Sequence, residues 1–146
     1  MSRQKQKGTR YERQSVLFWR GALKDPTIDR VALHGSTDEG DVRWLRPMAP
    51  WHVKHMTRGI LECKCYERYT PSDIARFRME TLAERENSGA DFAVLMMHVK
   101  GGSVANDRCQ LLLGDLMHVI CGGEDSSALD IWVELPAHEL AELMQP

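Results

Sequence analysis

No apolar run in this chain approaches the roughly 18 residues that a membrane-spanning helix needs. The N-terminus is basic and polar, and it lacks the apolar segment of a secretion signal. No internal repeat and no low-complexity segment occurs beyond that short basic stretch. The sequence therefore predicts a soluble, cytoplasmic protein without a membrane partner.

Cysteine is also scarce. The four cysteines form no CxxC pair and are too few for a disulfide scaffold, so we expect reduced thiols. The six histidines show no spacing typical of metal ligands. A zinc clip built on Cys63 and Cys65 is disfavoured, because in a strand both side chains would face the covering helices as small apolar groups.

What the chain does contain is typical of one globular domain over residues 1–146, with 42% apolar and 27% charged residues. A net charge of −2 argues against a nucleic-acid ligand, but the charges are unevenly distributed. Residues 1–30 hold eight Lys or Arg against three acids, whereas residues 101–146 hold eight acids and one Arg. Such a chain can present a basic face to phosphate groups. The charges of residues 1–6 would alternatively do no more than solvate a flexible basic tail.

Two short segments, Gly40-Asp41-Val42 and residues 60–65, carry the clearest chemical signal. If the second segment is a β-strand, its side chains alternate between faces, so Glu62 and Lys64 share one face and the neighbouring cysteines lie on the other. Asp41 on an adjacent strand would add a second carboxylate. Two carboxylates form a hard oxygen site that suits Mg²⁺, and Lys64 could act on a water or a phosphate. This combination indicates nuclease chemistry.

The rest of the pattern alternates helices and strands. Helices are expected over residues 9–23 with Thr9 as N-cap, 71–87 with Thr70 as N-cap and Gly89 as the end, and 136–144. Strands are expected over residues 30–33, from Asp41 onward, 60–65, 91–99 and 129–135. Residues 104–120 fit a helix, although 109–113 also fit a strand. Residues 44–59 are too irregular for either and indicate a long, functional or mobile connection. The order predicts a mixed α/β sheet with helices on both faces.

These residues resemble the PD-(D/E)XK nuclease superfamily. Its pattern is an aspartate followed by Glu-x-Lys, here Asp41 and Glu62-x-Lys64, after a helix that carries a glutamate, here Glu12. The resemblance implies the restriction-endonuclease-like fold, a mixed β-sheet flanked by helices.

Three further segments narrow the resemblance to the Holliday junction resolvases of archaea and their relatives in phages and actinobacteria. They are Lys7 to Arg13, Leu33 to Ser36 and Gly89 to Val94. The similarity covers residues 7–100. It implies a bacterial or phage-infected host cell, a DNA partner in the form of branched four-way junctions, and a homodimer, because resolving a junction requires two symmetric cuts.

By this resemblance the site depends on Mg²⁺, which Mn²⁺ could replace. The implied site residues are Glu12, Ser36, Asp41, Glu62, Cys63 and Lys64. The three carboxylates and the backbone carbonyl of Cys63 would hold the metal. Lys64 would orient or deprotonate the nucleophile or stabilise the phosphate charge, and Ser36 would hydrogen-bond a phosphate or a water. Phosphate contacts are expected from Lys7, Arg10, Arg13, Arg43, Arg46, Lys54, Arg58, Arg76 and Arg78.

Several alternatives stay open. Glu12 also fits a capping box with Thr9, and Lys64 could form an ordinary surface ion pair with Glu62 or Glu67. The resolvases often carry a glutamine on the helix after Glu-x-Lys, where this chain has Arg76, Arg78 and Glu80, which leaves a water-positioning role for that helix in doubt. Trp44 and Trp51 could stack on exposed bases or anchor the connection on the protein itself. The chain could also be a repair or restriction-like nuclease of the same fold, or a catalytically silent DNA-binding module.

Overall fold

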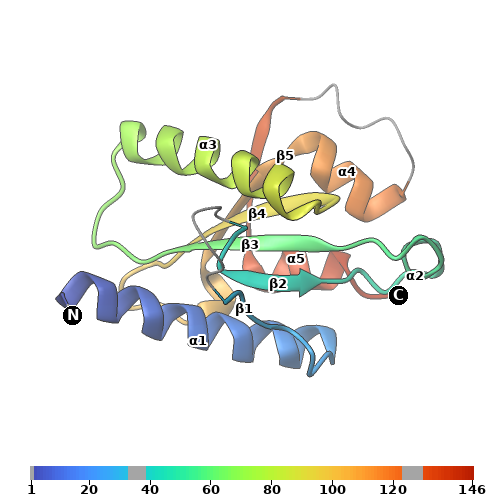
Figure 1. Ribbon diagram of the computed structural model, residues 1–146, viewed down its shortest axis with the longest axis horizontal. Helices are drawn as coiled ribbons and strands as arrows, with labels where there is room; N and C mark the ends of the chain where they lie inside the picture. Colours follow the sequence, from blue (N-terminus) through green and yellow to red (C-terminus); the bar gives the residue numbers. More distant parts are fainter. Residues whose placement is uncertain (1, 33–38, 123–129) are drawn as a thin grey trace.

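The computed structural model describes residues 2–32, 39–122 and 130–146. Its centre is a six-stranded sheet in which the strands lie side by side in the order of the chain, β1 to β6 (Figure 1). Neighbouring strands are antiparallel except β3 and β4, which are parallel. The expected mixed α/β sheet flanked by helices is therefore confirmed.

The strands are short and the helices vary widely in length. The strands are β1 (Asp29–Arg30), β2 (Val42–Leu45), β3 (Gly59–Lys64), β4 (Phe92–Met97), β5 (Arg108–Leu112) and β6 (Trp132–Pro136). The α-helices are α1 (Arg3–Leu23), α2 (Pro50–His55), α3 (Pro71–Ser88), α4 (Leu113–Cys121) and α5 (Ala137–Leu143), with a 3₁₀ turn η1 at Val104–Asn106. Within the described ranges, no helix is both long and apolar enough to cross a membrane.

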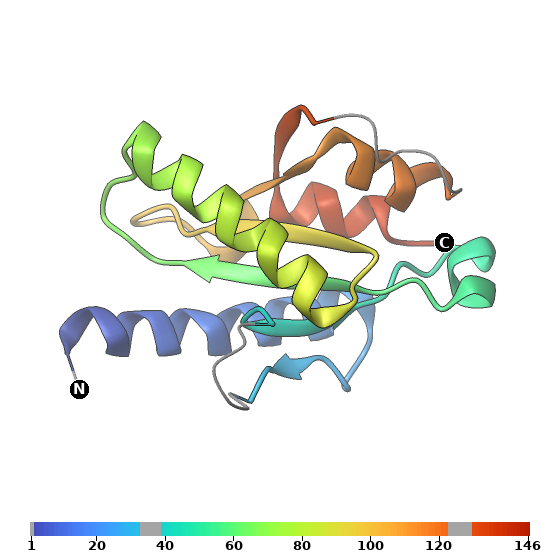
Figure 2. The same ribbon diagram turned by 45° about the horizontal axis from the view of Figure 1, so that its top comes forward.

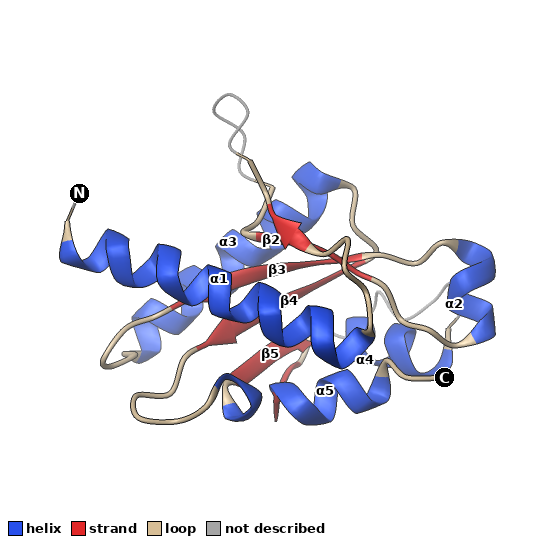
Figure 3. Ribbon diagram, turned by 90° about the horizontal axis from the view of Figure 1, so that it is seen from below, coloured by secondary structure: helices blue, strands red, loops and turns tan. Residues whose placement is uncertain are grey.

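Helices cover both faces of the sheet. α3 and α4 lie over one face (Figure 2), and α1 and α5 cover the other (Figure 3). Strand alternation divides the core accordingly, because Leu61, Val94 and Met96 belong to the large cluster that includes the α1 side chains, whereas Leu95 and Met97 pack with Phe77 of α3. The sheet therefore offers each strand one face toward α1 and one toward α3.

The first helix begins earlier than expected. α1 starts at Arg3, and Ser2 caps it by accepting a hydrogen bond from the N–H of Lys5 (3.2 Å). Thr9 is therefore inside the helix, so its predicted role as N-cap is wrong, and so is the alternative of a capping box between Thr9 and Glu12. Residues 3–6, which were expected to belong to a basic tail, form the first turn of this helix, because this Lys-, Arg- and Gln-rich stretch favours a helix and contains no residue that stops one.

The helix after β3 follows its sequence signals closely. Thr70 and Asp73 form a reciprocal capping box around Pro71, and Gly89 ends α3 with a φ of +70°. The expected cap and C-terminal glycine are confirmed, and the helix extends one residue beyond the predicted Asn87.

Two segments differ from their expected structure. Residues 44–59 contain the end of β2, the short helix α2 and the start of β3, because Pro50 begins a helical turn that the mixed composition conceals. Residues 104–120 contain η1, then β5, then all of α4 except its last residue, so the helix and strand alternatives each describe part of the segment. Strand β1 is shorter than predicted, and β6 extends to Pro136, one residue beyond its predicted end.

Candidate functional site

The end of β3 and the start of β2 meet at one edge of the sheet, close to the N-terminal half of α1. A hollow of about 340 Å³ lies there, and its wall includes Glu12, Asp41, Glu62 and Lys64. Four of the side chains that the sequence proposed as a site are thus brought together from three separate elements. We call the group of Asp41, Glu62 and Lys64 the carboxylate site.

Asp41 reaches this edge through an unusual backbone step. Gly40 has a φ of +95°, a conformation that L side chains rarely adopt, and it delivers Asp41 just before β2. The N–H of Asp41 donates to the carbonyl of Leu61 (3.0 Å), and Asp41 Oδ2 accepts from the N–H of Cys63 (2.8 Å). The main chain of Cys63 therefore contacts the site through its N–H, whereas the expected metal ligand is its carbonyl.

The two carboxyl groups of the site are poorly compensated. Burial, with the nearby charge of Glu62 as the second cause, raises the pKa of Asp41 to about 8, despite the hydrogen bond from Cys63 that opposes the shift. Glu62 is only 4% exposed, and its Oε2 atom is buried without a hydrogen-bond partner among the described residues. A positive charge bound here would favour the ionised form of Asp41 and would give the buried oxygen of Glu62 a partner.

Lys64 lies between two acids. Its Nζ is 3.1 Å from Glu62 Oε1 and 2.9 Å from Glu80 Oε2, and it lies 4.6 Å from the centre of the Phe77 ring. Burial alone would lower the pKa of Lys64, but the two carboxylates outweigh it and hold the pKa above its ordinary value. Lys64 is therefore a fixed cation, which suits charge stabilisation better than proton abstraction.

Glu12 lines the same hollow but is engaged by a neighbour. Arg30 of β1 contacts Glu12 Oε2 through both Nε and a terminal nitrogen, each at 2.8 Å. Glu12 nevertheless contributes to the raised pKa of Asp41, after burial and Glu62. It lies near enough to act electrostatically on the site, and a direct ligand role would require it to leave Arg30.

The carboxylate site fits a hard divalent cation in its chemistry. In the part of the chain that the structure describes, no group of three or more His, Cys, Asp or Glu side chains is placed to hold a metal ion. Mg²⁺ usually needs fewer protein ligands than this, since it keeps several waters and binds through one or two carboxylates together with substrate phosphates. Asp41 and Glu62 supply such a pair, with one buried oxygen unpartnered.

The other proposed residues are spread over the molecule. Ser36 lies outside the described residues. Arg43 pairs with Glu39 (3.4 Å), Arg76 contacts Asp73 (3.4 Å), and Arg78 donates to Gln110 (2.9 Å), so these three arginines already have protein partners. Residues Arg46, Lys54 and Arg58 belong to the connection around α2, at the opposite end of β3.

The α2 connection is anchored on the protein. Trp51 stacks on His55, with ring centres 4.0 Å apart, and meets His118 of α4 edge-on at 5.6 Å. This geometry favours the anchoring alternative for Trp51. Trp44 instead lies under the guanidinium of Arg58, 4.1 Å from the ring centre, and both side chains are partly exposed, so the base-stacking alternative stays open for Trp44.

Two ion-pair partners of residues at this hollow were not predicted from the sequence. Glu80 holds Lys64 from α3, and Arg30 holds Glu12 from β1. A signal for Glu80 exists, because a helix that follows the strand carrying Glu62 and Lys64 must cover one face of it, and Glu80 follows Arg76 by four residues. No local pattern links Arg30 to a residue 18 positions earlier.

The cysteines behave as small core residues. Cys63 and Cys65 pack against the α1 side of the core, on the opposite face from Lys64, as the strand alternation predicted. All four cysteines are free thiols.

Comparison with known proteins adds no assignment. No family model matches the chain, and no curated protein and no solved structure shows a significant similarity to it.

Proposed function

We propose that this protein is a metal-dependent DNA endonuclease of the PD-(D/E)XK type that acts on branched DNA, as a Holliday junction resolvase does. The observation that carries the proposal is the carboxylate site itself. It brings Asp41, which precedes β2, together with Glu62 and the charged Lys64 at the end of β3, and it leaves Asp41 with a raised pKa and Glu62 with one buried oxygen that lacks a partner among the described residues. Such groups cluster where a protein must bind a cation and a phosphate together.

Asp41 and Glu62 would hold Mg²⁺ or Mn²⁺, with the Cys63 carbonyl and Glu12 as further candidates by resemblance. A divalent cation bound there supplies a Lewis acid for the phosphodiester and a source of hydroxide near neutral pH. Lys64 keeps its proton and stabilises the negative charge that develops on the phosphate. Glu80 and Glu62 fix the direction of its ammonium group.

The charge distribution supports a nucleic-acid partner. Lys7 and Arg10 project from the half of α1 that borders the carboxylate site, and neither makes an ion pair with a described acid. A symmetric homodimer would place two such faces around a four-way junction, and substrate choice would rest on junction shape more than on base sequence.

One observation favours a second candidate, a DNA-binding module of the same fold without turnover. Glu12 is paired with Arg30, and Lys64 is paired with Glu80, so two of the charged side chains that line this hollow already have partners of opposite charge. In this case DNA would bind, but neither side chain would be released to a substrate.

The decisive experiment compares the cleavage of a synthetic four-way junction, a flap, a nicked duplex and a linear duplex, each with Mg²⁺, Mn²⁺ or EDTA. A resolvase cuts the junction symmetrically and only with a metal, whereas a repair or restriction-like enzyme prefers one of the other substrates. Binding without cleavage of any substrate would favour the silent module. A Glu86→Gln variant, altered at an exposed position on α3, serves as the active control.

A further inference from the structure

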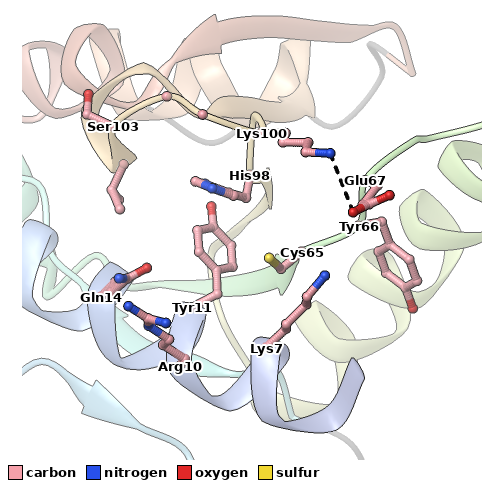
Figure 4. A pocket seen from close by; sticks show the side chains of 13 residues that line it. Lys7, Arg10, Tyr11, Gln14, Cys65, Tyr66, Glu67, His98, Lys100 and Ser103 are labelled. Carbon is pink, nitrogen blue, oxygen red and sulfur yellow. Dashed lines mark hydrogen bonds and ion pairs between the residues drawn. The ribbon is translucent and has the colours of Figure 1, made fainter. Parts of the chain in front are cut away.

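A second hollow lies beside the carboxylate site, on the other side of the same half of α1. It measures about 470 Å³ and is enclosed by α1, the end of β3 and the turn that joins β4 to η1 (Figure 4). Its lining includes three cations, Lys7, Arg10 and Lys100, and one acid, Glu67. We call it the basic hollow. None of the chemistry assigned to the carboxylate site uses it.

The positive charge of the basic hollow is poorly neutralised. Among the described residues, Lys7 and Arg10 have no acidic partner, and Lys100 meets Glu67 only at 3.5 Å, with both side chains mostly exposed. An exposed pair of this kind contributes little stability and separates easily. The hollow therefore keeps an excess of cations that can be offered to an anionic ligand.

The wall between these cations is rigid. Asp107 is fully buried and accepts three hydrogen bonds, from the hydroxyl of Tyr11 (2.8 Å), from His98 Nδ1 (3.0 Å) and from the N–H of Val99 (2.9 Å). Because the carboxylate accepts from Nδ1, the imidazole of His98 is fixed in direction and borders the hollow (Figure 4). These bonds tie α1 to the end of β4, so the cations are carried on a preorganised surface.

The turn that joins β4 to η1 leaves room for a ligand beside its main chain. Gly101 has a φ of +80°, and a Cβ atom built at this position would meet no atom within 4 Å, so the space beside its main chain is empty. A bulky anion can therefore reach the peptide groups of this turn as well as the side chains of Lys7 and Lys100.

The two hollows are adjacent. Cys65 and Tyr66, just after β3, line both of them. A nucleic-acid strand presents one charge every 3.4 Å or so along its axis, so a strand that enters one hollow brings further phosphates to the next.

We propose that the basic hollow binds a backbone phosphate of the same nucleic-acid strand whose phosphodiester lies at the carboxylate site. This inference rests on the proposed function, because it takes its ligand from that strand. It assigns Lys7, Arg10 and Lys100 to one phosphate next to the scissile one, and it gives Glu67 the role of a competing anion that the strand displaces.

The test measures binding of a fluorescein-labelled four-way DNA junction by anisotropy, in EDTA and between about 50 and 200 mM salt. The variant K7A/R10A/K100A is compared with Lys24→Gly, which removes one positive charge from the other end of α1. Lys24 is exposed with a φ of 50°, so glycine adopts its conformation without strain. Circular dichroism melting verifies that both variants are folded.

We expect the triple variant to lose about tenfold or more in affinity and about one unit of log-log salt slope, the value for one bound phosphate. Lys24→Gly should stay within about twofold of the wild type. Glu67→Gln should tighten binding, whereas Glu142→Gln, at an exposed position on α5, should not.

A triple variant with the affinity and salt slope of the wild type would overturn the inference. This holds even if inorganic phosphate alone shifts the NMR signals of the hollow in the wild type. That case would mean a site for free anions. If the wild type binds the junction through these cations but cleaves no DNA, the proposed catalysis fails and the phosphate site stands.

Discussion

The two ends of β3 differ in how well their polar groups are satisfied. Near its start, His52 of α2 is buried, with Nδ1 2.9 Å from Thr57 Oγ1 and Nε2 2.7 Å from the carbonyl of Val119. At its other end, Glu62 leaves a buried oxygen without a partner among the described residues, and Asp41 resists ionisation. The buried polar side chain near the start of β3 has its hydrogen-bond partners within the protein, whereas the carboxyl groups at the other end would be stabilised by a bound cation.

This difference distinguishes side chains that stabilise the fold through protein partners from side chains that are candidates for binding a ligand. A folded protein satisfies nearly all of its buried polar groups, so an exception calls for a binding or catalytic explanation. The histidine and tryptophan of α2 are unusual in sequence but ordinary in structure. The pair of Asp41 and Glu62 stands out in the sequence and is also costly in the structure.

The largest effect should come from the carboxylates. We expect Glu62→Ala or Asp41→Ala to lower junction cleavage by about a thousandfold or more, because binding of the cation and the developing charge both depend on them. DNA affinity should stay within a fewfold of the wild type, since it comes from Lys and Arg. Single-turnover cleavage and anisotropy measure the two quantities. Wild-type metal-dependent cleavage in either purified variant would contradict the site.

Lys64 should come next. Lys64→Ala is expected to lose about a hundredfold in cleavage rate, as when one group that stabilises developing charge is removed. The protein should remain folded, because the ammonium group lies at the hollow and its removal leaves the core intact. Lys64→Arg keeps the charge and should recover part of the rate. Wild-type activity in the alanine variant would assign Lys64 to an ordinary ion pair.

The α2 end should show the opposite behaviour. We expect His52→Ala to lower the free energy of unfolding by about 2 kcal/mol, because it leaves the Val119 carbonyl without a donor and creates a cavity. Cleavage per folded molecule should not change. His138→Ala, at an exposed position on α5, is the control for losing a histidine. A selective loss of cleavage in a stable His52 variant would place this end in the active site.

Asp41→Asn should stabilise the metal-free protein in a pH-dependent way. The folded pKa of about 8 exceeds the ordinary value of 3.8, so stability from protonated Asp41 is complete below about pH 4 and is lost as pH rises to about 8. Asparagine keeps the acceptor for Cys63 and never ionises. Its advantage should therefore grow by about 2 kcal/mol between about pH 5 and pH 8.5, below the full linkage value because the hollow opens to solvent.

Urea unfolding in EDTA at the two pH values measures this change, with Glu86→Gln as the control. A variant that is less stable than the wild type at the higher pH would show that burial and the charge of Glu62 do not disfavour the ionised form of Asp41.

The smallest effect should come from the basic residues near α2. The variant R46A/K54A/R58A should weaken junction binding modestly and reduce the salt slope by about one unit for each phosphate that these side chains bind in the wild type. The effect should be smaller than for the basic hollow, because these residues lie at the far end of β3. An unchanged slope in a folded variant would make this connection purely structural.

Local patterns in the sequence were enough to predict part of this architecture. Alternation along β3 placed Glu62 and Lys64 on one face, because the period of two is a property of the strand itself. The cap of α3 at Thr70 could be predicted because it depends only on residues within one turn of the helix. The start of α1 was not, since Ser2 and Thr9 are equally good caps and only the folded helix chooses between them.

Partners across elements were the other gap. The pairing of Glu80 with Lys64 and of Arg30 with Glu12 depends on how α3 and β1 pack, which no short window of sequence contains. The resemblance to a nuclease family named the expected site residues but not the side chains that contact them.

The hydrogen bond from the Cys63 amide to Asp41 also makes that amide proton a built-in spectroscopic probe. The proton belongs to the backbone, so it can be observed without a label or a substitution in the site. Anything that draws electron density from the Asp41 carboxylate, whether a proton or a cation, changes the chemical shift and exchange rate of this one amide. Occupancy of the site can therefore be followed by NMR before any substrate is known.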